Sequence, residues 1–456
     1  MVIETSSGNR YCYDINSNRI DVFNEGDVSP VMSPIVFGEV EKVERLPNID
    51  TFILELTQNC NFRCSYCCYG GNYEGNRTHS SKVMSEETLD KAISFIAKHR
   101  VPERMLNIVF YGGEPTLYPD KIKYFVGQAK GILPQDTDYT ISTNGSKLLD
   151  DNFLGWCVEH GFTLNISYDG TPQSELRRIY KNGSNTQQEV LNILEQIKTE
   201  YPEYWDSKVN ILVTLPDIHH LKPLAIEWSR TWVLRGKAPY LISGVSPCKL
   251  SDYAIDEKGT MGVMRDLMDF YAHNRDNLFA KTYFDLLCTP TLDRPIFPLP
   301  DKHTPLVCLP FNNRCYIDAN GQLGICEKTS DKLRLGDVSN CWDYNKVNEA
   351  ASYMAKQRKV RCADCELFRF CKTCYTNFYY DAERWRADCE WQKCWNRVAL
   401  TTSLELLENK LLDTETSTEC YLREIKDKDI PSIHRMMSNP QVMQHLDGGN
   451  YSANRQ

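Results

Sequence analysis

The chain has 456 residues, of which 41% are hydrophobic and 25% charged, as in a soluble globular protein with two or three domains. Its net charge of −9 weighs against a nucleic-acid-binding protein, which usually carries a basic excess. No run approaches the ~20 apolar residues that span a bilayer, and residues 1–11 lack the apolar stretch of a secretory signal. We therefore expect a cytoplasmic protein that binds neither membrane nor nucleic acid.

The first 50 residues contain a short hairpin pattern. Residues 10–15 and 19–23 flank a polar Asn16-Ser17-Asn18 turn, as two short antiparallel strands would. We expect residues 1–50 to form an N-terminal extension with an edge hairpin.

From residue 51 the pattern alternates between strand and helix. The strand candidates are apolar, β-branched or aromatic runs typical of buried parallel strands, at residues 51–57, 107–111, 138–143, 162–168, 209–215 and 240–245. The clearest helix follows Ser85, a good N-cap, and opens with Glu86 and Glu87, which suit the helix dipole. Repeated βα units predict an α/β fold with a parallel sheet. Six strands would make an incomplete barrel, which we place in residues 51–285.

Cysteines are numerous and unevenly spread. The chain contains 19, with four between Cys60 and Cys68 and ten between Cys308 and Cys394. Because cytosolic thiols stay reduced, clustered cysteines indicate metal binding or catalysis more than disulfides. The distribution predicts two metal-rich regions.

The first of these regions follows the first predicted barrel strand. Cys60, Cys64 and Cys67 read C-x3-C-x2-C. Three thiolates on one short loop suit a cubane iron–sulfur cluster and leave its fourth iron open to a ligand. The alternative is a structural zinc site. Such a site needs four protein ligands, and Cys68 lies too close to Cys67 to share one metal with it.

These residues resemble the signature of the radical S-adenosylmethionine (radical SAM) superfamily, C-x3-C-x-aromatic-C, with Tyr66 at the aromatic position. The resemblance implies a partial (βα)6 barrel whose three cysteines hold a [4Fe–4S] cluster that chelates SAM. One electron, from a donor such as flavodoxin or ferredoxin, then cleaves SAM to a 5′-deoxyadenosyl radical that abstracts a substrate hydrogen. In such an enzyme the protein binds and orients the cofactor and the substrate, and it excludes side reactions.

Further motifs of the family follow successive strand ends. They are Gly112-Gly113-Glu114-Pro115, Ser142-Thr143-Asn144-Gly145 and Ser167-Tyr168-Asp169-Gly170. Each is weak alone, but ligand sites in parallel α/β sheets gather at these ends. The resemblance implies SAM-binding roles for Gly112, Gly113, Glu114, Pro115, Ser142, Asn144, Asp169 and Arg178. One departure affects Arg178, because Ser174 stands where relatives often carry a histidine.

The second cysteine-rich region occupies residues 286–412 and begins with six prolines between Pro290 and Pro310, which predict irregular structure. Its cysteines resemble the SPASM domain, in the patterns Cys308-x12-Gly321-x4-Cys326 and Cys362-x2-Cys365-x5-Cys371-x2-Cys374, followed by Cys389. The family uses this domain to hold two auxiliary [4Fe–4S] clusters. Here two residues rather than three separate Cys371 from Cys374, which puts the ligand geometry at Cys374 in doubt.

By this analogy the cysteines divide between two auxiliary clusters. One takes Cys362, Cys365, Cys371 and Cys389, with Cys394 as a minor rival to Cys389. The other takes Cys308, Cys326 and Cys374, and its fourth ligand is Cys315 or its rival Cys288, or is absent. A pair of zinc ribbons is the alternative, since C-x2-C pairs also serve zinc.

Glu327 directly follows Cys326. In sulfatase-maturing relatives an aspartate at the matching place looks like the substrate base, and a carboxylate near buried clusters can be tuned for proton transfer. A solvated surface glutamate is the commoner outcome for such a residue. Both interpretations stay open at this point.

The C-terminal region holds a helix-like stretch at residues 399–411 and then a polar linker. Residues 421–430 resemble the first strand and helix start of a GNAT-type acetyltransferase, although no glycine-rich loop for acetyl-CoA follows. An ordinary C-terminal helix is the alternative. We assign residues 413–456 to the linker and this possible truncated start.

The resemblance implies an enzyme that acts on a precursor peptide or a protein. Enzymes of this architecture commonly mature ribosomally made peptides by oxidising or crosslinking a side chain, and we take this as the leading hypothesis. The alternatives are maturation of a folded protein such as a sulfatase, modification of a small molecule, and a non-catalytic metal-binding interaction module.

Overall fold

The computed structural model describes residues 1–412 except 41, 45–48, 74–75, 171–176, 216, 246–255, 304–310, 312, 330, 372–373 and 376–381, and describes only the backbone of 382–388. Met1–Leu411 form one compact unit, and Leu412–Gln456 are assigned to a second. The predicted linker and GNAT-like start therefore lie outside the described residues, as do Cys308 and Ser174. The domain bounds predicted from the sequence remain predictions.

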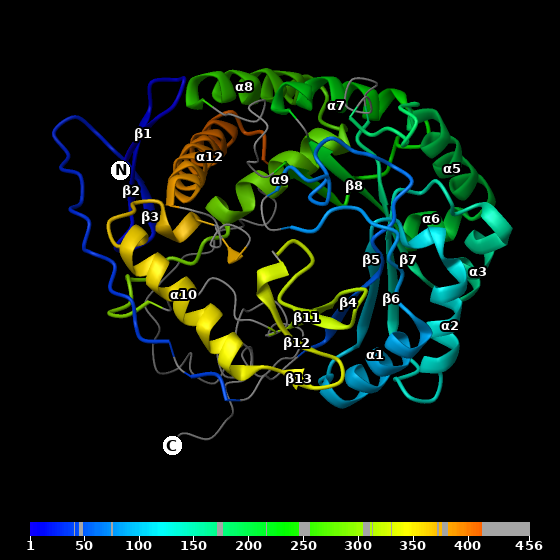
Figure 1. Ribbon diagram of the computed structural model, residues 1–456. Helices are drawn as coiled ribbons and strands as arrows, with labels where there is room; N and C mark the ends of the chain where they lie inside the picture. Colours follow the sequence, from blue (N-terminus) through cyan, green and yellow to red (C-terminus); the bar gives the residue numbers. More distant parts are fainter. Residues whose placement is uncertain are drawn as a thin grey trace, which may run out of the picture. The chain divides into compact units, whose positions relative to one another are not determined.

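A parallel sheet forms the centre of the first unit (Figure 1). Six strands pair in chain order, namely β4 (Thr51–Thr57), β5 (Asn107–Gly112), β6 (Asp138–Thr143), β7 (Thr163–Ser167), β8 (Val209–Leu215) and β9 (Leu241–Gly244). Each lies within one residue of its predicted range or coincides with it. The prediction of an α/β fold with a partial parallel barrel is confirmed.

Helices follow most of these strands, as βα units require. They are α1 (Glu86–His99), α2 (Pro119–Ala129), α3 (Phe153–Glu159), α5 (Gln187–Glu200), α6 (Pro202–Lys208), α7 (Leu221–Arg230), α8 (Glu257–His273) and α9 (Leu278–Leu292). The side chain of Ser85 caps α1 by accepting a hydrogen bond of 3.1 Å from the backbone N–H of Thr88, which confirms the predicted start. Among the described residues, no helix is both long and apolar enough to cross a membrane.

The same sheet continues into the cysteine-rich half of the chain. Strand β10 (Arg314–Ile317) pairs in parallel with β4, and β11 (Gln322–Gly324), β12 (Arg334–Asp337) and β13 (Cys341–Trp342) extend the sheet in antiparallel order. Helices α10 (Tyr344–Cys362) and α12 (Ala382–Glu408) complete this half. The sheet thus runs across the predicted boundary at residue 285.

Two sequence expectations about this half need correction. The helix expected at residues 399–411 is the end of α12, which begins at Ala382 and therefore carries Cys389 and Cys394 as well. Pro290 does not interrupt the chain, because it lies in the last turn of α9. Because proline has no backbone N–H, α9 lacks the hydrogen bond from this position to the carbonyl of Leu286, and the helix ends two residues later.

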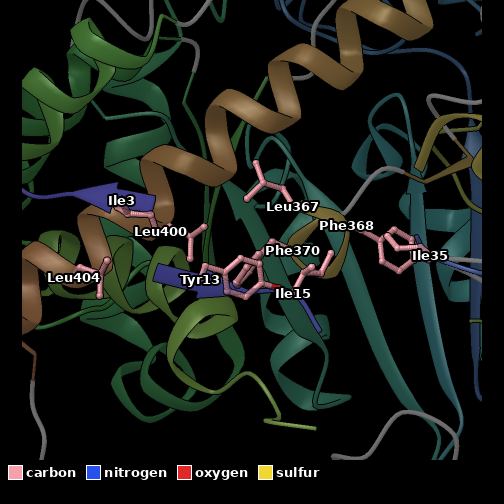
Figure 2. Packing of buried hydrophobic residues seen from close by; sticks show 9 residues of the cluster. All are labelled: Ile3, Tyr13, Ile15, Ile35, Leu367, Phe368, Phe370, Leu400 and Leu404. Carbon is pink, nitrogen blue, oxygen red and sulfur yellow. The ribbon is translucent and has the colours of Figure 1, made fainter. Parts of the chain in front are cut away.

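The N-terminal hairpin is part of a three-stranded antiparallel sheet, β1 (Val2–Glu4), β2 (Arg10–Asp14) and β3 (Arg19–Val22). Its inner face packs on the cysteine-rich half in a buried cluster that Figure 2 shows, made of Ile3, Tyr13, Ile15, Ile35, Leu367, Phe368, Phe370, Leu400 and Leu404. The rings of Tyr13 and Phe370 lie 4.9 Å apart. Cys362 and Cys365 pack against the same cluster. The N-terminal sheet therefore supports a predicted cluster site.

A truncation in this cluster tests that support. We expect Tyr13→Ala to lower the free energy of unfolding by about 3 kcal/mol, because a buried aromatic ring leaves a cavity. The matched control is Val22→Ala in the same sheet, at a side chain that is 65% exposed, and it should change stability by less than about 0.5 kcal/mol. Urea unfolding followed by circular dichroism measures both, and equal effects would refute the packing role.

Two glutamates of α12 hold the β1–β2 turn. Glu408 accepts hydrogen bonds of 2.8–3.0 Å from the side chains of Thr5, Ser7, Asn9 and Tyr11, and Glu405 accepts one of 2.8 Å from the backbone N–H of Ser6. Burial acts to raise the pKa of both carboxyls, but these hydrogen bonds, with Arg265 at Glu405, lower the pKa of each below its usual value.

This arrangement predicts a loss of stability in acid. A carboxyl with a depressed pKa stabilises the fold above its unfolded pKa, about 4.3, and that stabilisation disappears as the pH falls through the folded value. We expect the melting temperature of the wild type to fall more steeply below pH ~4.5 than that of Glu408→Gln. Glu4→Gln, an exposed position in β1, is the control. Parallel curves for Glu408→Gln and the wild type would contradict the prediction.

Candidate active site

A cavity of about 420 Å³ lies at the carboxyl ends of the parallel strands, within the size range of small-molecule sites. The residues that line it include Cys60, Cys64, Cys67, Gly112, Gly113, Glu114, Ser142, Asn144, Arg178 and Glu327. The structure therefore brings together three predicted cluster ligands, most predicted SAM contacts and the predicted base. Pro115 and Asp169 are buried close by but do not line the cavity.

The loop that carries the three cysteines is held on both sides. The backbone N–H groups of Arg63 and Ser65 donate to the carbonyls of Ile179 and Arg177, at 2.7 and 2.9 Å. The segment around Arg178 thus lies antiparallel to the cysteine loop, a pairing that the sequence did not indicate. These two backbone hydrogen bonds hold the cysteine loop against that segment.

Backbone amides point at two of the cysteine sulfurs. The N–H of Phe62 donates to Cys60 Sγ and that of Tyr69 donates to Cys67 Sγ, each at 3.4 Å. Such donors stabilise thiolates, whereas burial raises the pKa of the Cys60 thiol to about 12, so that a bound metal would have to displace its proton. Within the described ranges, no three His, Cys, Asp or Glu side chains are arranged to hold one metal ion. A cubane needs no such convergence, because each iron takes one thiolate.

Both glycines of the Gly112-Gly113 pair are required by close backbone packing. A Cβ at Gly112 would lie 2.2 Å from the carbonyl oxygen of Thr57, and one at Gly113 would lie 2.1 Å from that of Asn59. The amides of Gly113 and Glu114 donate to these same carbonyls, each at 2.8 Å. The end of β5 is therefore fastened directly to the start of the cysteine loop.

The Glu114 carboxylate is fully engaged with its own protein. It accepts hydrogen bonds of 2.6–3.0 Å from Thr116, from the Thr143 hydroxyl and from the backbone N–H of Asn144. Burial raises its pKa, and these hydrogen bonds act in the opposite direction. The carboxylate thus ties β5 to β6 and turns the Asn144 side chain toward Cys60, 4.0 Å from its sulfur.

Tyr66, the aromatic residue of the cysteine motif, joins two predicted SAM-binding residues. Its hydroxyl donates to the Asp169 carboxylate and accepts a hydrogen bond of 3.1 Å from Arg178. The Arg178 guanidinium also lies 3.8 Å from Asp169 and donates to the Ser167 carbonyl at 3.0 Å. Asp169, which does not line the cavity, therefore positions Arg178, which does.

Glu327 enters the cavity from the cysteine-rich half, across the pairing of β10 with β4. It is half-buried, its Oε2 atom is fully buried, and it accepts no hydrogen bond there within the described part of the chain. This position rules out the solvated surface glutamate that the sequence left open. A buried carboxylate oxygen without a donor is suited to accept a proton.

Other cavity residues were not predicted. Cys68, Tyr69, His79, Tyr111 and Lys328 all line the cavity. Cys68 and Tyr69 continue the cysteine motif and Tyr111 precedes the glycine pair, so their positions next to motifs were the available signal. Nothing in the local sequence marks His79, which lies on a long loop.

The predicted first auxiliary site is assembled by three segments. Burial raises the pKa of the Cys362 thiol to about 12, and the nearby thiols of Cys371, Cys365 and Cys389 raise it too. Cys389 is affected in the same way by Cys371 and Cys365. All four assigned residues are therefore neighbours, whereas Cys394 interacts with Glu257 and Asp256 instead.

The second auxiliary site is only partly described. Burial raises the pKa of the Cys326 thiol, with further contributions from Glu327 and Cys374, so Cys326 and Cys374 are neighbours. Cys315 is buried in β10 beside Cys341, and Cys288 is buried in α9 beside Ser403. Neither position identifies Cys315 or Cys288 as the fourth ligand. Cys308 lies outside the described residues.

The comparison with known proteins supports the interpretation drawn from the residues that line the cavity. The model of the Radical SAM superfamily matches residues 54–220. This part of the chain is a radical SAM domain. A [4Fe–4S] cluster with SAM is the cofactor set that this domain implies.

Curated relatives extend the similarity beyond the radical SAM domain. The chain is 23% identical over 348 residues to the cysteine-type anaerobic sulfatase-maturating enzyme of Clostridium perfringens, which covers 72% of this chain and 88% of the relative. It is 27% identical over 156 residues to the enzyme of the same name from Clostridium novyi, where the match spans only 40% of the relative.

Solved structures share the fold. A structure described as native anSMEcpe with bound AdoMet superposes with a TM-score of 0.59 at 18% identity, covering 80% of this chain and 99% of the other. The same protein with bound AdoMet and the Cp18Cys peptide gives a TM-score of 0.56. The superposed part is therefore larger than residues 54–220.

Removing one cysteine of the loop tests the cluster assignment. We expect Cys64→Ala to abolish SAM cleavage and to lower the iron content by about four from about twelve per chain, since one of three cubanes is lost. Cys157→Ala, at a buried cysteine in α3, should keep both the SAM cleavage and the iron content of the wild type. Iron and sulfide analysis with an anaerobic deoxyadenosine assay measures these effects. Continued SAM cleavage by Cys64→Ala would refute the assignment, and zinc without sulfide would favour the zinc alternative.

Proposed function

We propose that this radical SAM enzyme oxidises a side chain of a peptide or protein substrate, and that Glu327 accepts the proton released in that reaction. The observation that carries the proposal is the placement of Glu327 in the same cavity as Cys60, Cys64 and Cys67. A substrate side chain in this cavity would lie between the predicted cluster and the carboxylate.

The residues of the cavity fit the implied cofactors. Cys60, Cys64 and Cys67 would hold the cluster, with the amides of Phe62 and Tyr69 donating to sulfur. Arg178 would face the carboxylate of SAM, held there by Asp169 and Tyr66. When bound, the cluster and SAM supply an organic radical that takes a hydrogen atom from carbon.

The protein's own residues complete a two-electron oxidation. A substrate carbon in the cavity would give up one hydrogen atom to the radical that these groups would supply. The carbon left behind then forms a double bond to its neighbour as a proton passes to Glu327 and one electron passes to an acceptor. The cysteine-rich half, with Cys326 next to Glu327, would hold an iron–sulfur acceptor for that electron.

The relatives favour a protein or peptide substrate of the sulfatase-maturating kind. Both clostridial relatives are named for sulfatase maturation of the cysteine type, and the solved neighbour binds a peptide together with AdoMet. We therefore propose a cysteine side chain as the first substrate to test. Crosslinking of a ribosomally made peptide remains a prediction from the sequence resemblance.

An anaerobic assay with Glu327→Gln tests the proposal. Reduced enzyme is mixed with SAM and the Cp18Cys peptide, and deoxyadenosine and peptide mass are read together. We expect the wild type to give a lighter peptide. Glu327→Gln should form product at least ~100-fold more slowly while it still cleaves SAM, because only the proton acceptor is missing. Glu349→Gln, which makes the same change at an exposed position of α10 outside the cavity, is the control and should form product at the wild-type rate.

The outcomes separate the alternatives. Deoxyadenosine with an unchanged peptide removes this peptide, and the peptide encoded by the nearest short open reading frame is then tried in the same assay. Equal product formation by Glu327→Gln and the wild type would refute the role of Glu327 as base. If the wild-type enzyme with its full iron content forms no deoxyadenosine, the result would favour the alternative of a non-catalytic metal-binding module.

A further inference from the structure

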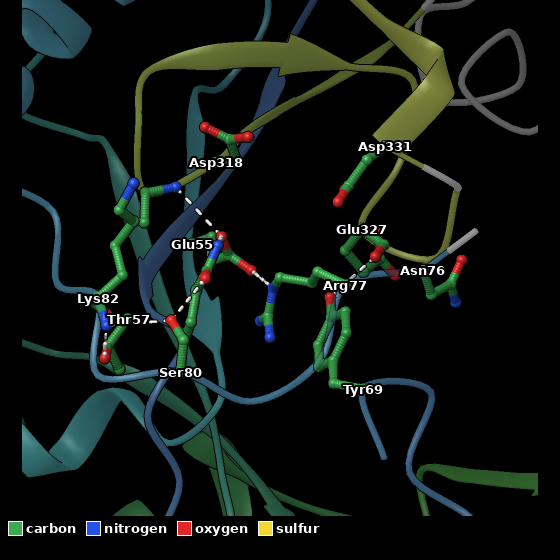
Figure 3. Close-up of polar contacts among 12 residues, drawn as sticks. Glu55, Thr57, Tyr69, Asn76, Arg77, Ser80, Lys82, Asp318, Glu327 and Asp331 are labelled. Carbon is green, nitrogen blue, oxygen red and sulfur yellow. Dashed lines mark hydrogen bonds and ion pairs between the residues drawn. The ribbon is translucent and has the colours of Figure 1, made fainter. Parts of the chain in front are cut away.

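Glu55 is a buried acid that connects three segments of the chain (Figure 3). It lies in β4 with no exposed surface, and its Oε1 atom pairs with Arg77. Its Oε2 atom accepts hydrogen bonds from the Gln58 side chain at 3.0 Å and from the backbone N–H of Ala319 at 3.1 Å. The sheet, the cysteine loop and the β10–β11 turn therefore share one carboxylate.

Arg77 carries this connection to the cavity wall. Its side chain is 7% exposed, and its guanidinium lies 3.5 Å from the centre of the Tyr69 ring. The Tyr69 hydroxyl donates to the backbone carbonyl of Glu327 at 2.8 Å, a contact drawn in Figure 3. A planar guanidinium stacked on an aromatic ring fixes the ring's tilt, which an ammonium group would not do.

Glu327 is thus fixed relative to the cysteine loop by two routes. One runs from Glu55 through Arg77 and Tyr69 to the Glu327 carbonyl. The other runs from Glu55 through Ala319 into β11, which ends two residues before Cys326. Both routes begin at the same carboxylate, so a change there would move Glu327 relative to the cysteines.

Stability alone does not account for such a pair. Removing two charges from water costs about as much as their attraction returns, so a buried ion pair adds little net stability. What it does contribute is a single geometry, because any displacement leaves a buried charge unpaired. Catalysis is sensitive to this, since a misplacement of about 1 Å can cost on the order of 100-fold in rate.

We infer that Glu55 and Arg77 are positioning residues that hold Glu327 at its working distance from the substrate through Tyr69. The inference rests on the proposed function of Glu327 as proton acceptor. Neither residue lines the cavity, so both act through residues that do.

The test is Arg77→Lys, which keeps the charge and removes the planar stack on Tyr69. We expect the ratio of deoxyadenosine to peptide product to rise about tenfold with SAM cleavage retained, because radicals form but deprotonation lags. The matched control is Arg265→Lys, which makes the same change beside another buried glutamate, Glu405, in a pair that the structure places against the β1–β2 turn. The ratio of deoxyadenosine to peptide product of Arg265→Lys should equal that of the wild type.

A double variant shows whether Arg77 acts through Glu327. If it does, Arg77→Lys combined with Glu327→Gln should form product no more slowly than Glu327→Gln alone. Multiplied losses, or a fall in deoxyadenosine and product in equal proportion, would overturn the inference. If Arg77→Lys does not fold with its iron, Tyr69→Phe replaces it, because that change removes only the hydroxyl bound to Glu327. An effect of Glu327→Gln without any effect of the positioning variants would refute this inference and leave the proposed function intact.

Discussion

The parallel pairing of β10 with β4 is the constraint on which the active site depends. Four residues of each strand pair, Arg314–Ile317 with Thr51–Leu54, and this joins the cysteine-rich half to the first strand of the barrel. Strand β4 runs directly into the cysteine loop, while β10 leads through β11 to Cys326 and Glu327. Because both strands point the same way, the cysteine loop after β4 and the β10–β11 turn lie at the same edge of the sheet. Strand β11 then runs antiparallel to β10, and Cys326 and Glu327 follow it. The predicted cluster and base therefore meet without any long loop.

The strands of the barrel could be predicted from the sequence, whereas the pairing of β10 with β4 could not. The apolar, β-branched or aromatic runs at 51–57, 138–143 and 209–215 coincide with strands, because such residues favour the strands of a parallel sheet. Strand β10, Arg314-Cys315-Tyr316-Ile317, is short and follows six prolines, so nothing local separates it from irregular chain. Its place beside β4 is set by long-range pairing, which no local pattern encodes.

The candidate site divides in the same way. Gly112 and Glu114 line the cavity, and their contacts with SAM stay predictions. The structure adds a role for them that the sequence did not indicate. The glycines allow close contact with Thr57 and Asn59, and the glutamate binds Thr143 and Asn144, so both serve the protein's own framework. Glu55 and Arg77 were missed because a single acid in an apolar strand and a single arginine in a loop become meaningful only when they meet.

The contact between the N-terminal sheet and α12 has a consequence for the order of folding during synthesis. Thr5 and Glu408 are bound to each other across 403 positions of sequence, so strands β1 to β3 must wait for α12 before they can make this contact. At the usual pace of translation this delay is roughly 20 to 80 s. Until then the N-terminal sheet lacks Leu400 and Leu404 of its buried cluster, so its packing beside Cys362 and Cys365 is incomplete. If these thiols hold the predicted auxiliary cluster, a newly made chain could thus receive its iron and sulfide before the N-terminal sheet is fully packed beside them.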